Sequence, residues 1–320
     1  MSNFRAPLGL VLLLIVFAGC ATVPKGVSNS NPALYLERDA QAYIRLSGTA
    51  ARDIAVTLGP ERMDKLFATV VATANRTVNG AAKGDKAAGA AVLDQKTLEM
   101  VLKRTNSAAI GLSALDTDKP FFESVFLGEF PSGSLPLAMV MSSDWSREPG
   151  GYIHKSGEFH LRSPSAGVLR LNSFPDSPRP AGSPAAKTVP ARFADRAMSD
   201  ILMWMEKPSE VFGRSIFGEA FDLPVSGMLF SAVRTSPSGA AEAGYLTDVV
   251  FVMESEATAR TYRPIMRFLW SAMADRLFGA GTGAANALNM EGDLYTVRGM
   301  WLSLDALTSA LAPTDASQPL

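Results

Sequence analysis

Two histidines lie close together in the sequence, at His154 and His160. Imidazole is a common metal ligand, so this spacing raises the question of a metal site. Ser156-Gly157 predicts the turn of a hairpin between them. A two-residue loop would pair His154 with Phe159 and His160 with Ile153, which puts the two rings on opposite faces. A three-residue loop would bring the rings together. We favour a surface hairpin without a metal site.

The glycine-rich run Gly279-Ala280-Gly281-Thr282-Gly283 has the composition of a loop that could bind phosphate through its backbone amides. A dinucleotide-binding loop follows a strand and opens a helix, and a P-loop also needs a lysine. Here the run follows a predicted helix and contains no lysine. We therefore expect Gly279 to end that helix in a left-handed conformation.

Residues for hydrolytic chemistry are scarce. The sequence contains no Gly-x-Ser-x-Gly elbow, and a serine triad could use only the two hairpin histidines. Asp116 and Asp118 lack the spacing of a calcium loop, so we interpret them as turn residues. We predict no catalytic residues, no metal and no cofactor. A lipid-anchored periplasmic hydrolase of unknown substrate is kept as the alternative function.

The composition favours a folded body. Of the 320 residues, 47% are hydrophobic and 19% are charged, which is enough apolar material for a substantial core. Lys plus Arg number 30 against 31 Asp plus Glu, so no basic surplus points to nucleic acid. The length fits about two domains of ordinary size.

The N-terminus has the pattern of an export signal. Arg5 provides a positive start, and Leu8 to Phe17 is an apolar run too short to span a bilayer. The run ends in Phe17-Ala18-Gly19-Cys20, and Cys20 is the single cysteine of the chain. A lone free thiol would be a liability in an oxidising compartment.

This ending resembles the lipobox of bacterial lipoproteins, in which small residues precede a cysteine that is diacylated before the signal peptidase cuts in front of it. Phe17 departs from the usual leucine at its position. The resemblance implies that residues 1–19 are a signal peptide, that Cys20 is lipidated, and that acyl chains on Cys20 hold the protein on a membrane. It also implies a place in the cell envelope, on the inner or outer membrane, with the body in the periplasm or on the cell surface.

The rest of the chain divides into a tether and two similar halves. Residues 20–32 are rich in Ser, Asn, Gly and Pro and predict a flexible tether. Residues 173–195 contain five prolines and predict a linker between a first half at 33–172 and a second half at 196–311. Residues 312–320 form a tail.

Hydrophobic periodicity gives the elements of each half. In the first half we expect strands at 42–46, 108–115, 122–130, 151–155, 158–162 and 168–172, with helices from about 60, at 93–104 and at 135–142. In the second half we expect a strand or helix start at 201–205, strands at 227–235, 245–253, 293–297 and 300–304, and helices at 209–217 and 255–277. The fold class is α+β, with two βαββαβ halves of ferredoxin-like type that form an α/β sandwich. A single α+β domain with the proline-rich stretch as a surface loop is the alternative.

The predicted helix at 255–277 is amphipathic. Its apolar residues are the candidate contacts to a membrane or to the wall of an apolar cavity: Tyr262, Met266, Phe268, Leu269, Trp270 and Met273. Arg260, Arg263 and Arg267 recur on the other face. Such a helix can lie in a membrane interface, or it can cover a sheet with its arginines in water. We predict that it either roofs an apolar cavity or reaches the membrane.

The lipobox, the proline-rich joint and the amphipathic helices together resemble exported spirochaete lipoproteins, including treponemal outer-membrane lipoproteins whose amphipathic helices can enter the bilayer. This resemblance is architectural and carries no functional residue. The sequence thus predicts a lipid-anchored envelope protein with a non-catalytic role. It would bind an apolar ligand or an envelope protein, or contact the membrane, and it would not bind nucleic acid.

Overall fold

The computed structural model describes residues 30–59, 101, 103–115, 121–130, 145–155, 159–174, 186–208, 223–235 and 244–311. The predicted signal peptide, Cys20, the tail, and the helices expected from 60, at 135–142 and at 209–217 lie outside these residues. So do Asp116 and Asp118.

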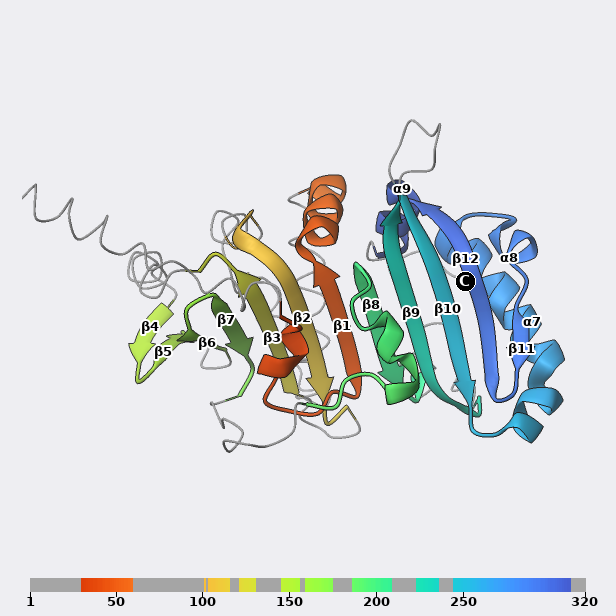
Figure 1. Ribbon diagram of the computed structural model, residues 1–320, viewed down its shortest axis with the longest axis horizontal. Helices are drawn as coiled ribbons and strands as arrows, with labels where there is room; N and C mark the ends of the chain where they lie inside the picture. Colours follow the sequence, from red (N-terminus) through yellow and green to blue (C-terminus); the bar gives the residue numbers. More distant parts are fainter. Residues whose placement is uncertain are drawn as a thin grey trace, which may run out of the picture.

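A single twelve-stranded antiparallel sheet forms the body (Figure 1). The strands of the first half are β1 (Ala42–Ser47), β2 (Thr105–Ser113), β3 (Phe121–Gly128), β4 (Trp145–Glu148), β5 (Gly151–His154), β6 (His160–Ser165) and β7 (Val168–Asn172). The strands of the second half are β8 (Ile201–Glu206), β9 (Val225–Thr235), β10 (Gly244–Met253), β11 (Asn289–Glu291) and β12 (Leu294–Ser303). The helical elements are η1 (Pro32–Tyr35), η2 (Ala191–Arg196), α7 (Glu256–Phe278), α8 (Thr282–Ala285) and α9 (Leu304–Leu311), and residues 48–59 are also helical.

The two halves share a strand order. Counted outward from the central pair β1 and β8, the first half runs β1-β2-β3-β7-β6 and the second runs β8-β9-β10-β12-β11. β5 and β4 extend the first half at its outer edge. Because β1 pairs with β8, the two halves form one continuous sheet.

The ferredoxin-like topology expected for each half is wrong. A βαββαβ unit places parallel strands side by side, whereas every strand pair in the described part of the chain is antiparallel. β2 returns beside β1 and β3 beside β2, and in the second half β8, β9 and β10 are neighbours in the same way. The α+β class holds, because helices pack on an antiparallel sheet.

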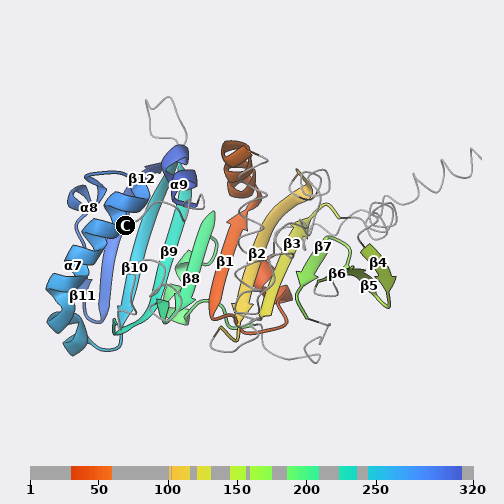
Figure 2. The same ribbon diagram turned by 180° about the vertical axis from the view of Figure 1, so that it is seen from behind.

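The core lies on both faces of the sheet. α7 and α9 cover one face of the second half, which Figure 2 shows from the α7 side. Buried side chains of that core include Tyr245, Met266, Trp270 and Tyr295. η1 and η2 lie on the opposite face, where Tyr43, Phe193 and Trp204 pack together. A third cluster packs around Phe126, Tyr152 and Leu161 in the first half.

The segment predicted as a proline-rich linker, 173–195, is described at residues 173–174 and 186–195. Its end forms the 3-10 helix η2, and both Ala186 and Phe193 are buried against the sheet. The backbone of Lys187 accepts a hydrogen bond from Ala40 N at 2.9 Å and donates to the Asp39 carboxylate at 2.9 Å. This part of the segment is thus fixed to the body.

Candidate membrane-contact site

α7 begins and ends near the residues that the sequence predicts. The Ser255 hydroxyl accepts a hydrogen bond from Thr258 N at 3.1 Å and so caps the first turn, where Glu256 also suits the helix dipole. The helix ends at Gly279, whose φ of 106° favours glycine. Pro264 lies inside the helix and is exposed.

The inner face of α7 packs on the sheet. Five of the six candidate residues belong to this core: Tyr262, Met266, Leu269, Trp270 and Met273. Trp270 is 2% exposed, its indole N–H donates to Asn286 O at 2.6 Å, and its ring meets Phe251 edge-on at 6.4 Å. The Tyr295 hydroxyl donates to Ala259 O and ties β12 to the helix. These side chains therefore hold α7 in place.

Phe268 lies on the outer face, where its side chain is 72% exposed. It is two residues from Met266 and two from Trp270, so it sits about 200° around the helix from each. Phe268 is thus the one member of the predicted set that faces away from the sheet, and it does not share a face with the other five. Its neighbour one turn back, Ile265, is 39% exposed.

Two exposed arginines lie on one flank of this outer face, and Arg267 is about 100° around the helix from its neighbour Phe268. Arg263 and Arg267 are exposed on the same side of the helix, one turn apart. Arg260 forms an ion pair with Glu256. The outer face of α7, defined here by Arg263, Ile265, Arg267 and Phe268, thus combines cationic and apolar groups.

A second exposed apolar group lies on the opposite face of the sheet. Leu246 of β10 pairs with Val233 of β9 on one side and with Trp301 of β12 on the other, and all three side chains are exposed. We call these three residues the sheet row. The arginine beside this row, Arg196, is paired with Asp248 at 2.9 Å, whereas the outer face of α7 carries exposed arginines.

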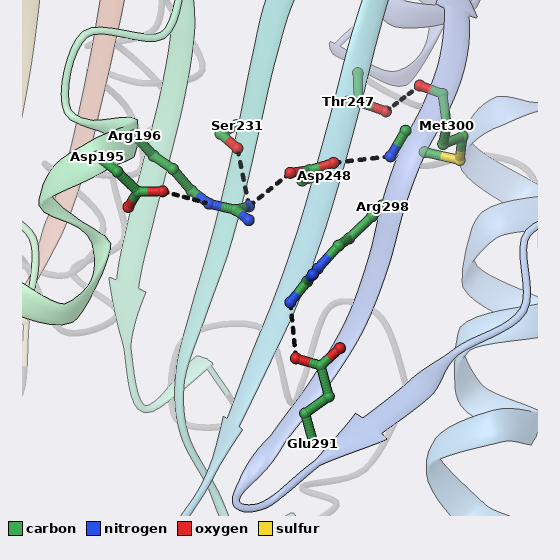
Figure 3. Close-up of polar contacts among 9 residues, drawn as sticks. Asp195, Arg196, Ser231, Thr247, Asp248, Glu291, Arg298 and Met300 are labelled. Atoms are coloured by element: carbon green, nitrogen blue, oxygen red, sulfur yellow. Dashed lines mark hydrogen bonds and ion pairs between the residues drawn. The ribbon is translucent and has the colours of Figure 1, made fainter.

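Beside the sheet row, an ion pair fixes η2 to the sheet (Figure 3). Arg196 Nη1 lies 2.9 Å from Asp248 Oδ2, and Asp248 Oδ1 accepts a hydrogen bond from Gly299 N at 2.8 Å. Gly299 has a φ of 68° at a shift in the β10–β12 register. Asp248 therefore stabilises this bulge and, through Arg196, the position of η2.

The first half buries a network of charged side chains that sequence reasoning missed. Glu37, just after η1, pairs with Arg170 of β7 at 2.7 Å, and its backbone N–H donates to both carboxylate oxygens of Glu123 at 2.9 Å. Burial raises the pKa of Glu123 to about 7, while the hydrogen bond from Glu37 and the charge of Arg170 act in the opposite direction. Glu37 and Glu123 are 86 residues apart in the sequence, so no local spacing predicts their contact.

The two histidines are placed as the prediction with a two-residue hairpin loop requires. Ile153 pairs with His160, which puts His154 and His160 on opposite faces of the ribbon. Both are buried, so the expected surface position is wrong. His160 Nδ1 lies 2.9 Å from Glu148 Oε1, and the His154 ring packs edge-on against Trp145. Within the described ranges, no group of three or more His, Cys, Asp or Glu could hold a metal ion.

Comparisons with known proteins bear on the fold. The sequence matches no protein-family model and no curated protein. Crystal form III of the treponemal protein TP0453 is 14% identical with a TM-score of 0.55, over 89% of this chain and 98% of that one. Form I is 15% identical with a TM-score of 0.54, over 91% and 98%. Form IV is 14% identical with a TM-score of 0.52, over 92% and 98%. At this identity the likeness is one of fold.

The likeness to a treponemal protein agrees with the architectural resemblance that the sequence suggested. Among the described residues, no helix is long and apolar enough to cross a membrane. The apolar cavity under α7 and the hydrolase alternative stay predictions.

Proposed function

We propose that this chain is a lipid-anchored envelope protein with a non-catalytic role, and that the outer face of α7 contacts an anionic membrane surface. The observation that carries the proposal is the exposure of Phe268 beside two exposed arginines, Arg263 and Arg267. A helix with aromatic and cationic residues on its exposed side can place the ring among acyl chains and the guanidinium groups among phosphates. Here α7 keeps its inner face on the sheet while its outer face meets the lipid.

The expected strength of this contact is modest. Each arginine near an anionic surface contributes about 1 kcal/mol, and burial of a phenylalanine side chain contributes about 2 kcal/mol. By itself, a contact of this size gives only weak and reversible binding to a membrane. Acyl chains on Cys20 would keep the body close to the bilayer, which raises the local concentration of the contact surface. The anchor and the helix face would therefore act together.

The fold of TP0453 and the lipobox at Phe17 to Cys20 support the same placement. The lipobox implies export and acylation. The shared fold shows that a body of this kind occurs in a treponemal protein.

Vesicle flotation of a Cys20→Ser protein tests the helix contact without the anchor. We expect binding to vesicles with anionic lipid, weaker binding at high salt because salt screens the arginines, and little binding to neutral vesicles. Phe268→Ala should lower the partition coefficient about 5- to 10-fold, which corresponds to about 1 to 1.4 kcal/mol. Phe268 is exposed, so its replacement should leave the unfolding transition unchanged.

Leu246→Ala, in the sheet row, is the matched control because Leu246 is also exposed and apolar. It should bind as well as the parent protein. If Leu246→Ala weakens binding and Phe268→Ala does not, the sheet row is the contact surface and the proposal for α7 fails.

A further inference from the structure

Three hydrogen-bonding side chains are buried on one face at the centre of the sheet. They are Tyr43 and Arg45 of β1 and Ser107 of β2, with exposed fractions of 1%, 5% and 5%. Tyr43 Oη, Arg45 Nε and Ser107 Oγ have no hydrogen-bond partner in the part of the chain that the structure describes. We call these three residues the central donor group.

The register places them along one face with Arg45 between the other two, because Tyr43 pairs with Gly111, four residues along β2 from Ser107. Tyr43 and Arg45 are two residues apart on one strand, so their side chains share a face. Arg45 pairs with Ala109 and Ser47 pairs with Ser107, which makes Ser107 the diagonal neighbour of Arg45 on β2. From β8, Leu202 pairs with Arg45 and Trp204 with Tyr43. β1, β2 and β8 are adjacent in the middle of the sheet (Figure 1).

The charge of Arg45 is poorly compensated. Its Nη1 donates a hydrogen bond to the Ser199 carbonyl oxygen, and none of the described carboxylates forms an ion pair with it. Burial lowers the pKa of Arg45, which Tyr43 and Asp200 partly oppose. Burial raises the pKa of Tyr43, so its hydroxyl stays protonated and available as a donor. A buried cation is costly unless an anion pairs with it, and buried polar groups in folded proteins almost always have partners.

We propose that the central donor group binds an oxyanion, the carboxylate or phosphate group of a ligand. Arg45 Nε, the Tyr43 hydroxyl and the Ser107 hydroxyl each supply one N–H or O–H donor, and the guanidinium supplies the positive charge. The oxyanion would be either a free ion or the head group of an amphiphile. This site lies on β1 and β2, so it does not depend on membrane contact by α7.

Thermal unfolding of the purified protein with three oxyanions tests the proposal. The probes are inorganic phosphate, decanoate and a short-chain phosphatidic acid, with decanol as the uncharged counterpart of decanoate. We expect at least one oxyanion to raise the melting temperature in a saturable way, and decanol to leave it unchanged. Stabilisation by inorganic phosphate identifies a free ion, whereas stabilisation by the amphiphiles alone identifies a head group.

Tyr43→Phe and Ser107→Ala remove one donor each and keep the shape of the side chain close to the original. Without oxyanion, both should raise the melting temperature, because each removes a buried polar group that lacks a partner. Each should also weaken oxyanion binding about 3- to 10-fold, the effect of one hydrogen bond.

Ser231→Ala is the matched control, because Ser231 is a buried serine of β9 whose hydroxyl lies 3.5 Å from Arg196 Nη1. It should not raise the melting temperature, and oxyanion affinity should stay at the parent value. The proposal is overturned if no oxyanion stabilises the protein, or if Tyr43→Phe and Ser107→Ala bind the oxyanion as tightly as the parent.

Discussion

Among the carboxylic acids that the structure describes, Glu123 has the environment least like that of an exposed surface group. Its carboxyl group is buried on β3 and receives the backbone N–H of Glu37. Burial disfavours the charged form and raises the pKa from 4.5 to about 7. This difference in pKa between the folded and unfolded states corresponds to about 3 kcal/mol in the free energy of ionising Glu123. The folded state therefore holds a proton on Glu123 over a pH range in which the unfolded chain has lost it.

This difference predicts the sign of a pH effect on stability. Between pH 4.5 and about 7 the folded protein binds more protons at Glu123 than the unfolded chain does, so the free energy of unfolding should fall as pH rises through this window. Glu123→Gln cannot ionise and should flatten that decrease. Urea unfolding at pH 5 and pH 8 measures it, and Glu129→Gln, on an exposed side chain, serves as control. An equally steep decrease in Glu123→Gln would show that other groups cause the effect.

At the scale of elements, α7 and α8 pack closely at Gly283. A Cβ atom at this position would lie 2.5 Å from Ser271 Cα and 2.7 Å from Ser271 O, both backbone atoms of α7. Gly283 N also donates to the Asp275 carboxylate at 2.8 Å. A close helix contact therefore explains the glycine at position 283.

Gly283→Ala should destabilise the protein by about 1 to 3 kcal/mol, because the backbone of α7 or α8 must move to accept the added methyl group. The midpoint of urea unfolding measures the change. Ala284→Ser alters the exposed neighbouring residue and should change stability by less than about 0.5 kcal/mol. A Gly283→Ala protein as stable as its parent would mean that α8 does not pack against α7 in this way.

Sequence periodicity predicts elements that bury one regular face. It gives the bounds of β7 and places β1, β10 and α7 within about two residues, because their apolar residues follow a period of 2 or 3.6. It misses β4 and β11, which are short edge strands of four and three residues with little apolar pattern. It reads β12 as two strands, because Arg298 and Gly299 form a bulge in the middle. It also misses the helices at 48–59 and 304–311.

For the candidate site too, sequence periodicity predicts the regular buried face but not the contacts between distant segments. The inner face of α7 follows from helical spacing, and Phe268 is the one candidate that lies on the outer face instead. The contact of Glu37 with Arg170 and the grouping of Tyr43 with Ser107 depend on strand pairing between distant segments. Element order does not say which strands pair, and for this reason the ferredoxin-like topology was also wrong. Pairing is a property of the folded sheet and leaves no local pattern in the sequence.

At the scale of the whole molecule, two runs of strands with one shared order meet at the β1–β8 pair and form a single sheet. α7 lies on one face of the second run, and the sheet row lies on the other. The predicted tether from Cys20 ends at η1, where Asn31 caps the helix and Pro32 is buried. If the chain is anchored through Cys20 and the segment before residue 30 is flexible, as predicted, either face could turn toward the bilayer. The charge beside Phe268 is what favours the outer face of α7 for lipid contact.

The anchor itself gives a prediction for the intact chain. Cys20→Ser removes the thiol that acylation needs, so the protein should move from the membrane fraction to the soluble fraction or stay unprocessed. Intact-mass measurement of the membrane-bound parent protein should show residues 1–19 removed and a lipid adduct on Cys20. A membrane-bound form that keeps unmodified residues 1–20 would contradict lipidation at this position.

The most direct test of membrane contact by α7 uses the absence of other thiols. Cys20 is the single cysteine, so a Cys20→Ser background accepts one fluorescent label at Phe268→Cys or, as the matched position in the sheet row, at Leu246→Cys. With anionic vesicles, the emission of the label at position 268 should shift to shorter wavelength and become protected from an aqueous quencher. The label at position 246 should keep its emission and its quenching. A label at position 268 that stays in water, or a shift at position 246 alone, would contradict membrane contact through the outer face of α7.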